Sequence, residues 1–276
     1  MLERLESAAS VSDDELRRGF TSFCMELDTQ MPPDPFSEEY RRSVLDLYEW
    51  LHGQPYATNH EHMVFDLEGH TQVPFPYATA GAATVGDYLM GVGHIIRTLD
   101  LAPKSRVLEF GAGWGHTTVA LAQMGHQVTA IDIGPNFVEL ICARAAQVNV
   151  PVDAVVGDFS LVHQLDRTYD AVLFFESFHH CADHLDLLGG LDRVLAPRGR
   201  VVFAAEPIQK SMPVPWGLRL DGESLWAIRR NGWLELGFRR SYFLEALRRF
   251  GWQAERVSNG ATRWGEIYVA RRLRGL

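Results

Sequence analysis

The sequence has few cysteines, and they are widely spaced. Its 276 residues include only Cys24, Cys142 and Cys181. This odd number follows neither a disulfide-rich pattern nor the Cys-x-x-Cys spacing of a zinc site. We therefore expect three reduced thiols, mostly buried, and no disulfide framework.

Long apolar runs and an excess of positive charge are also missing. No segment approaches the ~20 uninterrupted apolar residues that a membrane helix needs, and residues 1–6 lack the apolar centre of a signal peptide. The formal charge is -9 at pH 7, which leaves no basic face of the kind that binds nucleic-acid phosphates, although Arg residues cluster near the C-terminus. We expect a cytoplasmic protein that acts on neither membranes nor nucleic acids.

The chain does contain a regular α/β pattern from Arg106 onward. Short apolar runs alternate with helical segments that begin near Trp114, Pro135 and Asp183, and another helix is expected at about 241–250. This alternation is typical of a parallel sheet covered by helices on both faces. The expected strands are 106–110, 127–133, 152–156, 169–175, 199–205, 253–257 and 266–270.

Residues 1–100 have a different character and are expected to form a helical appendage or lid. Ser12 and Glu15 form a capping box, and an apolar stripe of helical period runs from Leu16 to Leu27. Further helices are expected from Ser37 to Gly53 and over 85–99. Residues 101–276 then form the main domain, interrupted at 208–240 by an insertion too long for a plain loop.

A glycine-rich turn follows the first strand. Gly111, Gly113 and Gly115 are placed where the chain turns into a helix and where a ligand can approach the backbone. A dinucleotide site would need glycine at position 116, which is His116, and Glu109 would repel a pyrophosphate. The turn therefore suits a cationic ligand better than a dinucleotide.

Acidic residues end the next two strands. Asp132 stands about twenty residues beyond the loop, where a carboxylate can accept hydrogen bonds from ribose hydroxyls. Asp158 can accept from an adenine amino group while Phe159 covers the base. Alternatively, the three glycines could serve only a turn, and Asp132 or Asp158 could cap the loop that follows it.

Together with Tyr169 to Leu173, these motifs resemble the class I S-adenosylmethionine-dependent methyltransferase family over roughly residues 103–272. Segment 195–200 is similar to the family's Leu-x-Pro-Gly-Gly turn, with Arg198 in place of its first glycine. The resemblance implies a Rossmann-like, mostly parallel seven-stranded sheet of order 3-2-1-4-5-7-6. It also implies S-adenosylmethionine as cofactor, bound by Glu109, Phe110, Gly111, Gly113, Trp114, Gly115, Asp132, Ile133, Asp158, Phe159 and Glu176.

Two histidines follow the fourth strand, where substrate and cofactor would meet. His179 and His180 resemble the His-His pair of small-molecule and sugar methyltransferases, in which either could be the general base for an acceptor hydroxyl. Adjacent side chains point different ways, so at most one is expected to face the substrate, and we favour His180. Glu206 after the fifth strand could orient a histidine or bind a substrate hydroxyl.

A histidine-rich stretch in the appendage is the other candidate for chemistry. His60, Glu61, His62 and His70 match no standard zinc spacing, and we expect no metal.

The insertion is rich in Trp and Arg. We expect Trp216, Arg219 and Trp226, together with Tyr77 and Tyr88 of the appendage, to form a lid and substrate wall. Segment 215–226 is similar to methyltransferases of bacterial polysaccharide assembly. The predicted reaction is O-methylation of a sugar, glycan precursor or other hydroxylated small molecule. N-methylation, a non-catalytic cofactor-binding module and a homodimer remain open.

Overall fold

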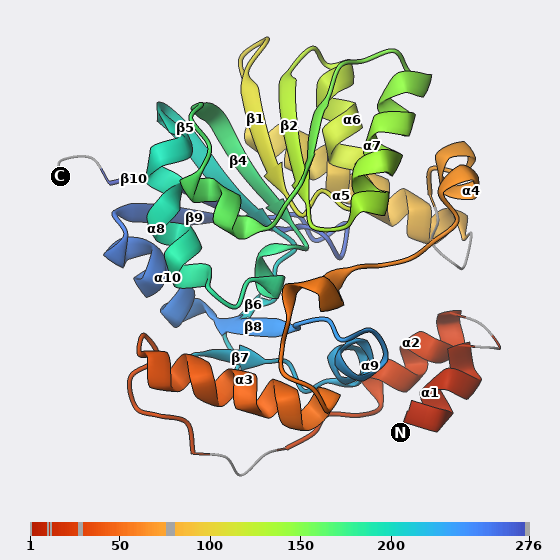
Figure 1. The fold of residues 1–276 in the computed structure, drawn as a ribbon, viewed down its shortest axis with the longest axis vertical. Coiled ribbons are helices and arrows are strands. Elements are labelled where there is room, and N and C mark those ends of the chain that lie inside the picture. The colour runs from red at the N-terminus through yellow and green to blue at the C-terminus, as the bar shows by residue number, and fades with distance from the viewer. Residues whose placement is uncertain (1, 10, 12, 27–29, 76–80, 274–276) are drawn as a thin grey trace.

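A seven-stranded sheet forms the centre of the molecule in the computed structural model, which describes residues 2–9, 11, 13–26, 30–75 and 81–273. Its order is β3-β2-β1-β4-β5-β10-β9, and β10 runs antiparallel to both of its neighbours. The predicted fold class and strand order are therefore confirmed (Figure 1). The strands are β1 (Arg106–Phe110), β2 (Gln127–Asp132), β3 (Asp153–Val156), β4 (Tyr169–Phe175), β5 (Leu195–Ala204), β9 (Trp252–Ser258) and β10 (Glu266–Arg272).

The central strands were predictable because both of their faces are buried. In β1, Val107 faces a core shared with α5 (Ala82–Leu99) and α6 (His116–Gln123), whereas Leu108 faces a core shared with α8 (His184–Val194) and α10 (Arg240–Arg249). A strand buried on both faces reads as a continuous apolar run. The remaining crossover elements are α7 (Pro135–Gln147), η2 (Phe159–His163) and η3 (Phe178–His180).

The N-terminal part is helical, as expected, but its first helices are short. These elements are α1 (Leu2–Ala9), α2 (Asp13–Thr21), α3 (Glu38–His52), η1 (Thr58–Glu61) and α4 (Leu67–Gln72). Ser37 caps α3 by accepting from the Tyr40 amide, and Gly53 ends it at φ 92°. The helix predicted to reach Leu27 stops at Thr21, and Leu27 and the capping Ser12 lie outside the described residues.

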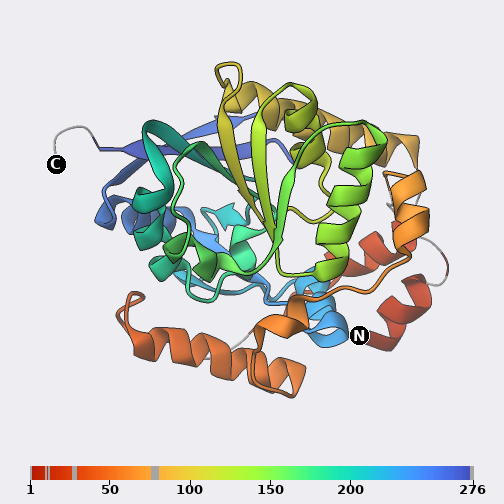
Figure 2. The same cartoon turned by 45° about the horizontal axis from the view of Figure 1, so that its top comes forward.

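The insertion forms a small sheet of its own. Its elements are β6 (Ile208–Gln209), β7 (Trp216–Leu218), α9 (Gly222–Asn231) and β8 (Leu236–Arg239), with the strand order β6-β8-β7. In Figure 2, α2 lies beside α9, and the chain from α3 to α4 passes between the insertion and the central sheet. The N-terminal part and the insertion thus meet at the carboxyl end of the parallel strands.

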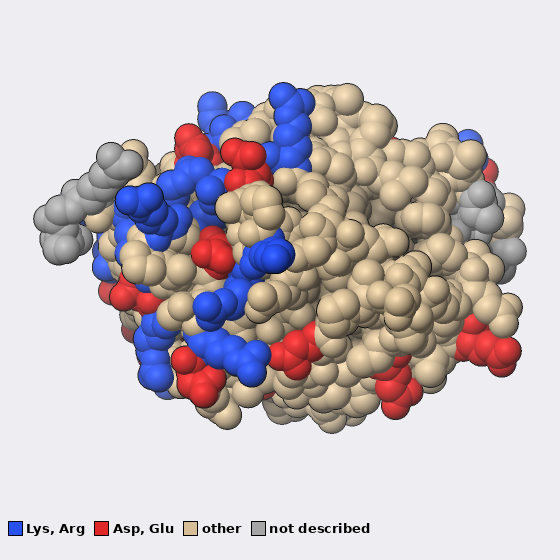
Figure 3. Space-filling view, turned by 90° about the horizontal axis from the view of Figure 1, so that it is seen from above, with Lys and Arg blue, Asp and Glu red and all other residues tan. Residues whose placement is uncertain are grey.

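Three features expected from composition can be compared with the structure: the distribution of charge, long apolar helices and the burial of the cysteines. Lys and Arg side chains gather on one side of the face in Figure 3, interspersed with Asp and Glu. Between β10 and β9, Arg271 pairs with Glu255 at 2.7 Å. No helix in the described part of the chain is long and apolar enough to cross a membrane.

Only Cys181 is buried, so the expectation of mostly buried thiols is wrong for Cys24 and Cys142.

Candidate active site

The glycine turn after β1 is built by close approach of neighbouring chain segments. Gly111 has φ 63°, and a Cβ there would lie 2.4 Å from the Cβ of Ser177. Gly115 has φ 72°, and its Cβ would lie 2.6 Å from Cγ1 of Ile141. Any other residue would be strained and would collide at either position. Because these glycines carry no side chain, the backbone of the turn can pack closely against its neighbours beside the cavity at the end of β1.

Asp132 and Asp158 both serve the local backbone and face this cavity. The Asp132 carboxylate accepts from the amides of Gly113 at 2.7 Å and Gly134 at 2.8 Å, which fixes the glycine turn to the end of β2. Asp158 caps η2 by accepting from the Ser160 amide at 2.9 Å. A carboxylate has about four lone-pair sites, so each retains capacity for a ligand. The capping and ligand-binding interpretations are compatible here.

Glu109 and Glu176 are carboxylates on the cavity wall: Glu109 is 1% exposed, whereas Glu176 is accessible from the cavity. Burial raises the pKa of Glu109 to about 7, although the hydroxyls of Thr117 and Thr118 donate to it. Desolvation likewise raises the pKa of Glu176 to about 7, against a hydrogen bond of 2.7 Å from the Trp264 indole. A bound cation would stabilise the charged form of both groups.

The cavity itself has a volume of ≈ 740 Å³, within the usual range for sites that bind small molecules and cofactors. Among the predicted cofactor residues, Gly115 is not part of the described lining, because it faces Ile141. The predicted residues that do line it are Glu109, Phe110, Gly111, Gly113, Trp114, Asp132, Ile133, Asp158, Phe159 and Glu176.

His180 is the member of the histidine pair that lines the cavity. Its Nδ1 lies 3.1 Å from Oε2 of Glu61 in η1. Burial alone would lower the pKa of His180, but the carboxylates of Glu61, Glu235 and Glu206 outweigh it and raise the pKa to about 9. His180 is therefore protonated at neutral pH in the protein without ligands.

His179 points instead into the protein, toward Glu206. Its Nδ1 lies 2.8 Å from Glu206, whose carboxylate also accepts from the amides of Ser177, Phe178 and His179. Burial, followed by the charge of His180, lowers the pKa of His179. Burial raises the pKa of Glu206 to about 7, although the three amides oppose this shift. Neither residue lines the described cavity, and together they hold the loop that presents His180.

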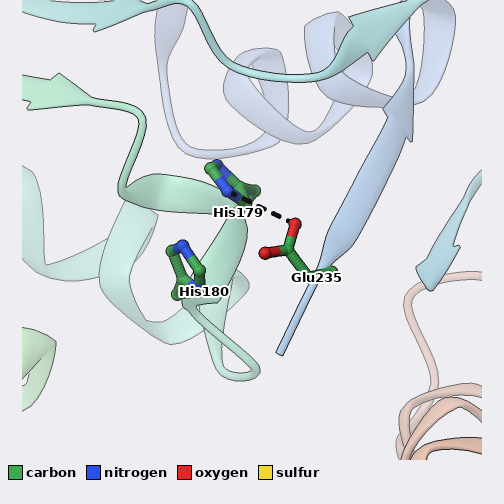
Figure 4. A group of neighbouring side chains, drawn as sticks. All are labelled: His179, His180 and Glu235. Atoms are coloured by element: carbon green, nitrogen blue, oxygen red, sulfur yellow. Dashed lines mark ion pairs between the residues drawn. The ribbon is translucent and has the colours of Figure 1, made fainter. Parts of the chain in front are cut away.

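Figure 4 shows His179 and His180 next to each other, with Glu235 facing them from the chain just before β8. One ligand-type atom of each lies within 4.8 Å of the other two. Glu235 Oε2 is 3.8 Å from His179 Nε2 but only 2.9 Å from Arg219 Nη2. Because Glu235 already pairs with Arg219, and His179 with Glu206, we interpret this group as a charge network.

The substrate wall expected in the insertion is corrected by the structure. Trp216 is 2% exposed and packs in the core on Tyr40, with its indole donating to the carbonyl of Pro35 at 2.8 Å. Arg219 pairs with Glu235, and Trp226 packs on Phe20. These three predicted residues are absent from the described cavity lining, and Tyr77 lies outside the described residues.

Other residues form the wall in their place. Tyr88, which was expected in the lid, does line the cavity. Trp233 belongs to the Trp- and Arg-rich insertion that was expected to form the wall. The lining residues that no motif predicted for the site are Tyr56, Glu61, Glu223, Arg263 and Trp264. Glu61 was considered only as part of a histidine-rich stretch. Arg263 and Trp264, in the turn between β9 and β10, carry no motif that would distinguish them.

Comparisons with known proteins agree with this geometry. Residues 108–203 match the family described as "Methyltransferase domain". A ubiquinone biosynthesis O-methyltransferase of Xanthomonas campestris is 34% identical over 103 residues, which is 37% of this chain and 43% of that protein. An S-adenosyl-L-methionine-dependent Diels-Alderase of Talaromyces variabilis is 35% identical over 116 residues, 41% of this chain and 39% of that protein. The chain thus spans about two fifths of the length of these relatives.

A solved structure extends the similarity in fold. The mitomycin 7-O-methyltransferase MmcR aligns with a TM-score of 0.55 at 15% identity, covering 87% of this chain and 73% of MmcR. The strand order, the glycine turn and the acidic strand ends define a Rossmann-like methyltransferase fold. Residues 108–203 carry a methyltransferase domain, and the fold around them is that of class I S-adenosylmethionine-dependent methyltransferases.

Proposed function

We propose that the protein transfers a methyl group from S-adenosylmethionine to a hydroxyl group of a small molecule. The observation that carries this proposal is a single cavity that extends from the glycine turn and Asp132 to His180. Both reactants could therefore meet in one enclosed site, where a displacement can be aligned and water excluded.

The cofactor end of the cavity fits the proposed ligand chemically. Asp132 offers free lone pairs to ribose hydroxyls, and Asp158 offers them to an adenine amino group. Glu109 and Glu176 offer negative charge beside the glycine turn, where the cationic part of the cofactor would lie. The cofactor supplies an electrophilic methyl group on a positively charged sulfur.

At the acceptor end, His180 is the proposed general base. Its Nδ1 lies at ion-pair distance from Glu61, so Nε2 is the ring nitrogen proposed to take the proton of an acceptor hydroxyl once His180 is neutral. We assign His179 and Glu206 to positioning this loop. A neutral amine acceptor would need no base, so N-methylation is expected to respond weakly to His180→Gln.

The acceptor itself is proposed to be a hydroxylated ring compound, and a sugar is the first candidate to test. Trp233 lines the cavity with its ring centroid 6.4 Å from that of His180. Its flat face can stack on a ring while a hydroxyl group reaches the histidine. Trp233 therefore takes the role in acceptor binding that was expected of Trp216 and Trp226.

A second candidate is catalysis that uses the bound cofactor without consuming it. It is favoured by the similarity to a protein named as an S-adenosyl-L-methionine-dependent Diels-Alderase. The two candidates differ in a measurable product, because only methyl transfer converts the cofactor into S-adenosylhomocysteine.

The first test is calorimetric titration of S-adenosylmethionine into the wild type and Asp132→Asn. Asn keeps one acceptor oxygen but loses the charge, so we expect the Kd to rise about tenfold or more, equivalent to about 1.4 kcal/mol. Asp170→Asn on the opposite end of β4 is the control and should bind like the wild type. Absence of binding to folded wild type would refute the proposed function. S-adenosylhomocysteine release with a panel of sugars and phenols then tests methyl transfer.

A further inference from the structure

Glu61 connects three parts of the chain at the acceptor end of the cavity. It belongs to η1 in the N-terminal part, and its Oε2 lies 3.1 Å from His180 Nδ1 after β4. Its Oε1 accepts from the amide of Leu234, in the insertion, at 2.8 Å. The Glu61 side chain is only 10% exposed. Its two oxygens are thus divided between the insertion and the candidate base.

We propose that Glu61 is a positioning residue that fixes the tautomer and orientation of His180, so that the N-terminal part completes the acceptor site. This inference rests on the proposed function. A carboxylate can only accept from Nδ1–H, and this leaves the Nε2 lone pair for the acceptor hydroxyl. Without such a partner, the ring can rotate or carry its proton on the wrong nitrogen.

Glu61 differs from the other carboxylates near His180 in its position relative to the imidazole ring. The charged and titratable groups that influence His180 include Glu61, Glu206, Glu235, His179 and Asp132 across the cavity, and Arg219 pairs with Glu235. Glu206 pairs with His179, whereas Glu61 lies directly against the Nδ1 of His180. Within the described residues, Glu61 is the carboxylate placed to select which nitrogen of His180 keeps its hydrogen.

The division of the two oxygens allows a catalytic role to be separated from a structural one. In Glu61→Gln the remaining oxygen can still accept from the Leu234 amide, so the link to the insertion is kept. The new amide group would face Nδ1 as a donor and favour the opposite tautomer. Glu61→Asp keeps the charge with a shorter side chain.

The first experiment is an NMR titration of histidine-labelled full-length protein, with the His180 signal assigned by its loss in His180→Gln. We expect the His180 pKa to fall by about one unit or more in Glu61→Gln, because the paired negative charge is gone. Glu61→Asp should restore most of the shift, and Glu49→Gln on the exposed face of α3 is the control. An unchanged His180 titration in folded Glu61→Gln would overturn the inference, whatever reaction the protein catalyses.

The second experiment measures turnover. At pH values above 9, where His180 is neutral, Glu61→Gln should lower kcat about 100-fold, the lower end of what general-base catalysis contributes, while the Kd for S-adenosylmethionine stays unchanged. In the His180→Gln background the same change should have no further effect, because the two residues act as one unit. Independent, multiplicative losses would contradict the positioning role. A protein that binds the cofactor but releases no S-adenosylhomocysteine would instead refute the proposed function and leave the NMR result standing.

Discussion

Acidic side chains determine much of the behaviour of individual residues in this site. Glu109 and Glu176 lie on the cavity wall with hydroxyl or indole donors but no cationic partner within hydrogen-bond distance in the described structure. The surrounding protein replaces water around these groups without supplying a cation, and this raises the pKa of both to about 7. If they bind the cationic part of the proposed cofactor, they do so at a cost to the stability of the free protein.

Glu176→Gln tests whether this carboxylate lowers the stability of the free protein while increasing its affinity for S-adenosylmethionine. Gln can still accept from the Trp264 indole but cannot ionise. The wild-type protein loses stability as pH rises from 4.5 to about 7, because folding holds the Glu176 proton that the unfolded chain releases. The variant should therefore match the wild type near pH 4.5 and exceed it at pH 8, measured by urea unfolding without ligand. Its affinity for S-adenosylmethionine should fall, and a variant less stable than the wild type at pH 8 would contradict this explanation.

The strands of the central sheet could be predicted from the sequence, whereas the arrangement of side chains in the insertion could not. The bounds of β1 and β4 match the expected strands, because a doubly buried parallel strand leaves an uninterrupted apolar run. Trp216 and Trp233 look alike in sequence, yet one is buried on Tyr40 and the other lines the cavity. No local pattern distinguishes them, because the difference depends on where α3 packs.

Replacing each Trp separates the two roles. Trp216→Ala should lower the free energy of unfolding by about 3–5 kcal/mol, the usual cost of truncating a buried large aromatic residue, and leave the acceptor KM of the remaining folded protein unchanged. Trp233→Ala should raise the acceptor KM about tenfold, equivalent to about 1.4 kcal/mol, with a smaller effect on unfolding. Urea unfolding and steady-state kinetics of both variants provide the comparison. A raised KM in Trp216→Ala with normal stability would restore the substrate wall expected from the sequence.

At the scale of the whole molecule, the cavity combines segments that are distant in the chain. Sequence motifs predicted a cofactor end from residues that follow consecutive strands of one sheet edge. They did not predict Glu61 or Arg263, which come from the N-terminal part and the β9–β10 turn, and they did not distinguish Trp233 from the other Trp residues of the insertion. These segments approach His180 only after the chain has folded, so their roles depend on tertiary packing.

The assembled cavity is strongly acidic, and this predicts how ligand binding depends on pH. Six carboxylates line its described part against two guanidinium groups, Arg17 and Arg263, and the protonated imidazole of His180. Near pH 5, Glu109 and Glu176 are protonated in the free protein, and near pH 8 both are charged. A cation therefore gains more by binding at the higher pH, when its charge is neutralised by these groups.

The rise in Tm produced by saturating S-adenosylmethionine should accordingly be larger at pH 8 than at pH 5, because a ligand stabilises the folded state in proportion to the logarithm of its affinity. S-adenosylhomocysteine has the same amino acid and nucleoside groups but an uncharged sulfur, so its Tm shift should change less between the two pH values. Differential scanning fluorimetry at fixed ionic strength measures both ligands side by side. In Glu176→Gln the pH dependence for S-adenosylmethionine should shrink toward that of S-adenosylhomocysteine. Equal pH dependence for the two ligands in the wild type would mean that these carboxylates do not sense the sulfonium charge, and their placement on the cavity wall would then need another explanation.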